Sequence, residues 1–189
     1  NNSLPSATTL QVNAGTLDLQ SFSSTVGSVA LNGGTITGAA TLTAANYNLA
    51  GGNVNANLGA GTLSQTANNT NLNGTSAANV VNVTGGALVL GSGARLANNA
   101  AVLVGSGGTL DVRGEIIGSL ANNGTVEIQS GGSLTVTGNC VQGAGSTRVN
   151  AGSTFAVPNG FTLTGGTISG NGTIQGNVIN NGARLTPGA

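Results

Sequence analysis

Three charged side chains lie close together in the stretch Asp-Val-Arg-Gly-Glu, residues 111–115. Asp111 and Arg113 are two residues apart, so on a β-strand they share one face, and Glu115 follows after a glycine. Glu127 comes about one short repeat later, where it can stack beside Asp111. We therefore expect two carboxylates within bonding range of one guanidinium. Such a group is either a surface ion pair between neighbouring repeats or a small glycan-contact or hydrolytic patch.

The chain has few other residues that could do chemistry. Its 189 residues include four acidic and four basic side chains, and it has no His. All four bases are arginines. Without His or Lys, no ordinary base can activate the many Ser and Thr hydroxyls as nucleophiles. The sequence therefore predicts no catalytic residues, no cofactor and no metal site.

Charge and cysteine content exclude several classes of partner. The formal net charge is zero and 4% of the residues are charged, so there is no basic stripe for phosphates and no polybasic membrane patch. No window approaches the length of a membrane-spanning helix. Cys140 is the single cysteine, and we expect it to be a small buried hydrophobic residue. Nucleic acid and a direct membrane span are therefore not expected.

A short phrase of residues is repeated along the chain: Gly, then a small or polar residue, then an aliphatic one. The secondary-structure elements that position the charged residues must be built from this repeat. Many of its intervals are roughly 16 to 22 residues, in the size range of solenoid repeats. The phrase begins at residues 14, 33, 51, 60, 85, 107, 123, 131, 159, 165 and 171.

Within each phrase, aliphatic residues alternate with polar ones, as at Leu110 and Val112 or Val126 and Ile128. This two-residue alternation of apolar and polar side chains, bounded by Gly and Asn, indicates short β-strands with one face in the protein interior. Asn-Gly is also typical of hairpins, so an antiparallel sandwich is the alternative, but its core normally needs bulkier residues than this chain supplies. We predict an all-β, single-stranded parallel β-helix, or β-solenoid, whose complete turns, here called rungs, contain about 18–20 residues.

We expect residues 1–189 to form one continuous β-solenoid segment of a longer chain, less regular over about 62–82. Four Thr-x-Thr pairs suggest a second interpretation, a flat threonine array like those of ice-binding β-solenoids. The pairs do not keep a constant interval, which favours ordinary outward threonines on strands. They begin at Thr35, Thr41, Thr135 and Thr162.

Four passages resemble passenger regions of bacterial autotransporters, including the autotransporter-associated β-strand repeat, and filamentous-haemagglutinin-type adhesins: VNAGTLDL, VNVTGGALVLGSGARL, NGTVEIQSGGSLTVTG and GTIQGNVINNGARLTPGA. The resemblance covers most of the chain at the level of composition and repeat. It implies a right-handed β-helix exported to the bacterial surface. The strands with aromatic girdles that form the translocator barrel of that family are not present in this sequence.

Together, the repeat and the scarcity of catalytic residue types predict a non-enzymatic structural or adhesive protein, a stalk or an adhesin passenger. Its expected location is extracellular or on the bacterial outer surface, and its expected partner is a glycan or protein of a host or neighbouring cell. The alternative is a self-assembling extracellular fibre, because uncapped solenoid ends expose unpaired strand edges. A third possibility is a glycan hydrolase or lyase that uses the Asp111–Glu127 patch.

Overall fold

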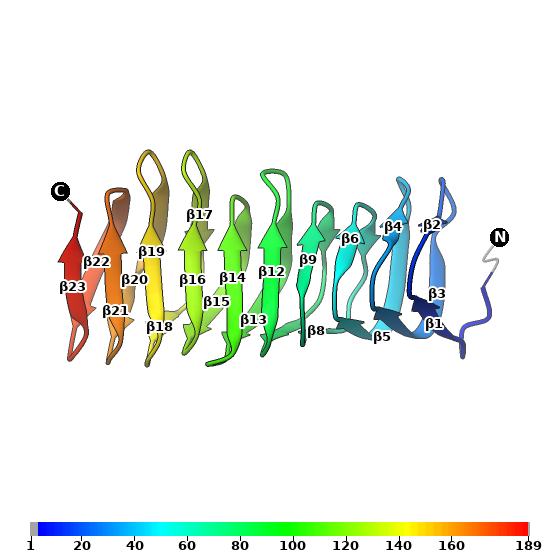
Figure 1. Ribbon diagram of the computed structural model, residues 1–189, viewed down its shortest axis with the longest axis horizontal. Coiled ribbons are helices and arrows are strands. Elements are labelled where there is room, and N and C mark those ends of the chain that lie inside the picture. The colour runs from blue at the N-terminus through cyan, green and yellow to red at the C-terminus, as the bar shows by residue number, and fades with distance from the viewer. Residues whose placement is uncertain (1–3, 189) are drawn as a thin grey trace.

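The chain folds into a straight rod of stacked β-strands (Figure 1). The structure is a computed structural model that describes residues 4–188, and within that range it contains strands and turns but no helix. The N-terminus lies at one end of the rod and the C-terminus at the other. The predicted all-β parallel β-solenoid is confirmed, with about ten rungs. No helix in residues 4–188 is long and apolar enough to cross a membrane.

The strands belong to two sheets, and every pairing in both is parallel. The 13-stranded sheet contains β1 (Thr9–Val12), β3 (Ser24–Leu31), β5 (Thr41–Leu49), β7 (Asn57–Leu58), β8 (Thr62–Gln65), β10 (Thr75–Ser76), β11 (Val80–Val83), β13 (Arg95–Val104), β15 (Glu115–Asn122), β17 (Ser133–Val136), β18 (Cys140–Gln142), β20 (Thr154–Leu163) and β22 (Thr173–Asn180). The 10-stranded sheet contains β2 (Thr16–Asp18), β4 (Thr35–Thr37), β6 (Gly52–Val54), β9 (Asn69–Leu72), β12 (Gly86–Leu90), β14 (Gly108–Val112), β16 (Thr125–Ile128), β19 (Ser146–Val149), β21 (Thr167–Gly170) and β23 (Arg184–Pro187).

Each rung has three sides. The register of the larger sheet shifts between Leu96 and Ala100 in β13 and between Val157 and Phe161 in β20, which marks a bend. In other rungs the same bend separates two short strands, such as β17 and β18. The strands before the bend form the first side, those after it form the second side, and the 10-stranded sheet forms the third side.

The length of a rung varies while the strands stay in register. The step between stacked residues ranges from 16 residues, between Leu110 and Val126, to 22, between Leu90 and Val112. The corner loops absorb this difference, since the hydrogen-bonded strands must superpose from one rung to the next. Segment 62–82 contains β8 to β11, and its strands pair with those of neighbouring rungs.

Inward side chains stack into apolar columns along the axis of the rod. Neighbouring strands lie about 4.8 Å apart, so like residues touch from rung to rung and small aliphatic side chains fill the interior. Phe155 and Phe161 pack edge to face near the C-terminal end, with ring centroids 5.2 Å apart. One fully buried column on the third side consists of Ile36, Val54, Leu72, Leu90, Val112 and Ile128.

Stacked glycines line the corner between the second and third sides. Gly145 has φ of 66°, and a Cβ there would collide with the carbonyl oxygen of Gly124 one rung earlier. This corner therefore favours glycine for both its backbone conformation and its close stacking, and it accounts for most of the Gly-led phrases of the sequence. Asn68, with φ of 44°, takes the corresponding place in one rung. Two columns offset by two residues line it: Gly15, Gly34 and Gly52 stack in the first three rungs, and Gly86, Gly108, Gly124, Gly145 and Gly166 stack in the later rungs.

Buried polar side chains fill the inside of the same corner. The hydroxyl of Thr147 donates to Oε1 of Gln142 at 2.6 Å, and Nδ2 of Asn122 donates to Oγ1 of Thr147 at 3.1 Å. Gln65 and Thr70 have the same spacing in an earlier rung, but Oε1 of Gln65 and Oγ1 of Thr70 have no hydrogen-bond partner. The side-chain oxygens of Gln142 and Thr147 are thus hydrogen-bonded, whereas those of Gln65 and Thr70 are not.

The Thr-x-Thr pairs lie on different sides of the rod. Thr35 is on the third side in β4, whereas Thr135 is on the first side in β17 and Thr162 on the second side in β20. These threonines form no single flat array.

Candidate functional site

Asp111 and Glu127 stack on the outer face of the third side. Asp111 in β14 is the register partner of Glu127 in β16, as the strand spacing predicts. Nε2 of Gln129 donates to Oδ2 of Asp111 at 2.8 Å, and Nδ2 of Asn150 donates to Oε1 of Glu127 at 3.0 Å. Each carboxylate is therefore bound by the amide of a residue from a following strand or corner.

The expected bridging guanidinium makes no ion pair with these carboxylates in the part of the chain that the structure describes. Arg113 follows β14 at the corner between the third and first sides, where it is exposed. Glu115 lies beyond that corner in β15 and pairs with Arg95, at 2.7 Å between Nε and Oε2. Asp111 and Glu127 thus stack as expected, but the partners of their carboxylates are side-chain amides and not Arg113. Arg95 was missed, although it lies one rung before Glu115.

Partial burial shapes the electrostatics of Asp111. Burial raises the pKa of this carboxyl above its usual range, the hydrogen bond from Gln129 lowers it, the negative charge of Glu127 raises it and the positive charge of Arg113 lowers it. The net direction is upward, because removal of a carboxylate from water disfavours its charged form. Asp111 thus holds its proton to a higher pH than a fully solvated aspartate.

An open hollow of about 310 Å³ lies at the corner beside these residues. Arg95, Arg113 and Glu115 line it together with Ser133 and Thr135 of β17. The two guanidinium groups offer donors, the carboxylate offers acceptors and the hydroxyl groups offer both. The lining therefore suits a polar ligand that presents several hydroxyl groups. The ion pair itself is half exposed and contributes little to stability.

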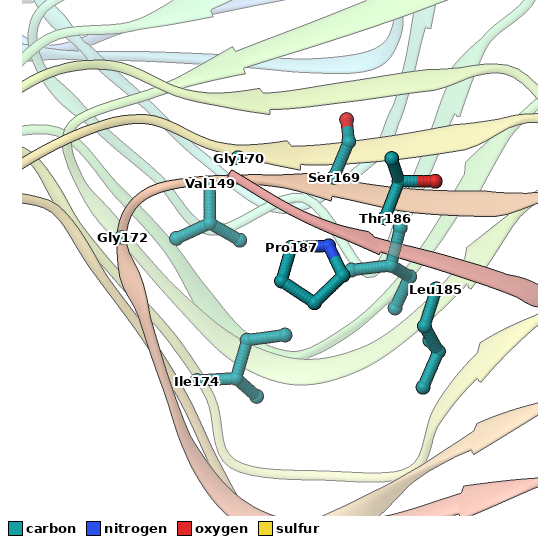
Figure 2. Close-up of a pocket in the computed structure, with 9 residues that line it drawn as sticks. Val149, Ser169, Gly170, Gly172, Ile174, Leu185, Thr186 and Pro187 are labelled. Carbon is teal, nitrogen blue, oxygen red and sulfur yellow. The ribbon is translucent and has the colours of Figure 1, made fainter. Parts of the chain in front are cut away.

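A second hollow, at the C-terminal end of the rod, is apolar. Figure 2 shows Val149, Ile174, Leu185 and Pro187 around it. Its volume is about 190 Å³. It lies inside the last rungs, where β22 and β23 each pair with one strand, so it is the open end of the inward columns.

The arrangement offers hydrogen-bonding groups on an open surface. Within residues 4–188, no group of three or more His, Cys, Asp or Glu side chains is placed to hold a metal ion. Cys140 is buried, and burial raises the pKa of its thiol to about 12.

No protein-family model, curated protein or solved structure matches this chain.

Proposed function

We propose that this chain is a non-enzymatic structural or adhesive β-solenoid of a bacterial cell-surface or secreted protein, a stalk or an adhesin passenger. The continuous register of the third side supports this proposal, since each of its ten strands lies on the preceding one. Strands about 4.8 Å apart give a rod roughly 45 Å long whose axial hydrogen bonds resist bending. The resemblance of the sequence to autotransporter passengers and haemagglutinin-type adhesins supports the surface location.

The corner hollow is the proposed contact with a glycan of a host or neighbouring cell. Its lining of two guanidinium groups, one carboxylate and three hydroxyls suits the vicinal hydroxyl groups of a sugar. The shallow surface leaves the ligand exposed, so each contact is weak and adhesion depends on many copies acting together.

Beads coated with the purified chain test this function on an array of bacterial and animal glycans. We expect bead binding that Arg113→Gln lowers at least tenfold, whereas Arg184→Gln, on β23 of the last rung, leaves it unchanged. Uniform loss or uniform retention of binding in both variants would contradict the assignment of the hollow. Release of sugar products that stops on substitution of Asp111, Glu115 or Glu127 would instead show an enzyme.

End-to-end assembly into a fibre is the second candidate, and the apolar C-terminal hollow favours it. Leu185 is 50% exposed there, and within residues 4–188 β22 and β23 each pair with a strand on one edge only, which leaves the other edge to pair with a strand of another chain. Electron microscopy of the purified chain separates the two candidates. Long unbranched filaments support the fibre, and uniform short rods support the stalk or adhesin.

A further inference from the structure

The corner hollow lies in a notch between two longer loops. At the corner between the third and first sides, two residues (113–114) connect β14 with β15, whereas four residues (91–94) connect β12 with β13 and four (129–132) connect β16 with β17. In Figure 1 the loop above β14 is accordingly lower than the loops above β12 and β16. Arg113 belongs to the short loop, and residues of both neighbouring rungs line the hollow with it.

The dimensions of the notch limit the length of a ligand. The two longer loops belong to rungs that are two strand spacings apart, about 10 Å between their backbones. The volume of the hollow, about 310 Å³, is at the lower end of the range for ligand pockets, which starts at about 300 Å³. The longer loops also obstruct a polymer laid along the rod at this corner. We therefore expect the hollow to take a single sugar residue that enters between the loops.

No aromatic side chain lines the hollow to stack on a sugar ring. The chain has three Phe, one Tyr and no Trp. Tyr47, Phe155 and Phe161 are buried in the core, and Phe22 lines a different hollow in the first rung. Because ring stacking is not available there, a sugar in the corner hollow must be held by hydrogen bonds and charge.

One of the two guanidinium groups in the hollow remains for a ligand. Arg95 is paired with Glu115, at 2.7 Å between Nε and Oε2. The side chain of Arg113 makes no hydrogen bond or ion pair within residues 4–188. The carboxylate of Asp111, which interacts with Arg113 at longer range, accepts a hydrogen bond from Gln129. Two arginines and one glutamate give the lining a net charge of +1, so it attracts an anionic group.

The geometry of a guanidinium selects the kind of anion. Its planar fork of N–H donors matches the two oxygens of a carboxylate, whereas a phosphate ester, like a sulfate ester, presents three oxygens. We propose that the corner hollow binds a sugar that bears a carboxylate, with the carboxylate on Arg113 and the ring hydroxyls on Ser133 and Thr135. This inference rests on the proposed adhesive function and narrows its ligand to glycans that contain an acidic sugar.

Titrations with matched sugars, followed by heteronuclear NMR of the whole chain, test the proposal. The probes are the methyl glycosides of glucuronic, galacturonic and N-acetylneuraminic acid, the uncharged methyl ester of each, and the sulfate ester of methyl glucoside. We expect at least one acid to bind about tenfold more tightly than its ester, because charge-assisted hydrogen bonds are roughly twice as strong as neutral ones, and to shift the amides of residues 113–115. Equal binding of every acid and its ester, or tighter binding of the sulfate, would overturn the proposal.

Substitutions of arginine locate the carboxylate. Arg113→Gln should lower the affinity for the acid to that for its ester, and Arg113→Lys should give an intermediate affinity, because it keeps the charge but not the planar fork. Arg184→Gln makes the same change of charge on β23 in the last rung and is the matched control. Equal weakening by Arg113→Gln and Arg184→Gln would show general attraction by charge and overturn the proposal. Circular dichroism checks that the variants fold.

The results also separate this inference from the proposed function. If each acid binds no more tightly than its ester and Arg113→Gln weakens both, the hollow contacts glycans without recognising a carboxylate, and this inference alone fails. If no acid or ester shifts an amide of the hollow and no glycan of the array binds the beads, the glycan contact of the proposed function fails with it.

Discussion

Stacking gives single residues neighbours that are distant in the sequence. Asp111 lies beside Glu127 and is bound by Gln129, while Thr147 and Asn122 meet inside the corner although 25 residues separate them. Because the chain has few polar groups in its interior, the buried contact between Thr147 and Asn122 should have a measurable effect on stability.

The pKa of Asp111 makes a prediction about pH. Burial raises the folded pKa above the usual value of 3.8, so the folded chain binds this proton more tightly than the unfolded chain does. The contribution of Asp111 to stability is therefore largest below pH 3.8 and is lost as the pH rises through the folded pKa. We expect Asp111→Asn to remove this decline, as measured by urea unfolding at a series of pH values. Glu127→Gln should move the decline to lower pH, and identical pH profiles for wild type and Asp111→Asn would contradict the prediction.

Two threonines of one inward column provide a matched pair of substitutions. Thr147→Val removes the hydroxyl that binds Gln142 and accepts from Asn122, so we expect it to lower the free energy of unfolding by about 1–3 kcal/mol. Thr70→Val removes a buried hydroxyl that has no partner and is expected to be neutral or stabilising. Chemical denaturation measures both, and equal losses in the two variants would contradict this account.

At the scale of elements, the glycine corner sets the spacing between strands. The carbonyl oxygen of a corner glycine accepts a hydrogen bond from the next rung. For example, the amide of Thr167 donates to the carbonyl oxygen of Gly145 at 3.0 Å. A methyl group at this position would separate the rungs. The strands on both sides of the corner would then lose register.

Two glycines with similar backbone conformations separate this packing effect from the conformational one. Gly145 and Gly131 have φ of 66° and 72°, but a Cβ at Gly131 would meet nothing within 4 Å. We expect Gly131→Ala to cost about 1–2 kcal/mol from the left-handed backbone alone, and Gly145→Ala to cost at least 2 kcal/mol more because of the collision with Gly124. Thermal and urea unfolding compare the two variants. A cost at Gly145 no greater than at Gly131 would show that the corner can relax.

For the whole molecule, stability should depend on position along the rod. Strands β12 to β16 have hydrogen-bonded neighbours on both sides, whereas β22 and β23 each have one and are largely exposed. In a solenoid the free energy is close to a sum of contacts between neighbouring rungs. The ends should therefore open before the middle.

Hydrogen exchange measures this gradient directly. We expect amides of β12, β14 and β16 to exchange most slowly and those of β22 and β23 fastest, because a terminal rung has one neighbouring interface and not two. Uniform protection along the rod would indicate a single cooperative unit and would contradict the sum of rung contacts. End-to-end filament formation would instead slow exchange at both ends of the rod, in β22 and β23 and in β1 and β2, which connects this measurement with the second candidate function.

The sequence by itself determined the class of fold. Alternation of residues such as Leu110 and Val112 is a local signal for a strand face, and glycine is a local signal for the left-handed backbone found at many corners, so both repeat visibly along the chain. The stacking of Asp111 on Glu127 followed from the same spacing. Only the tertiary structure decided that Arg95 binds Glu115, that amides bind the carboxylates of Asp111 and Glu127, and that Leu103, Val141 and Ile179 belong to one outward column. The reason is that rungs of 16 to 22 residues change length from one to the next, so outward neighbours depend on how each corner loop absorbs the difference.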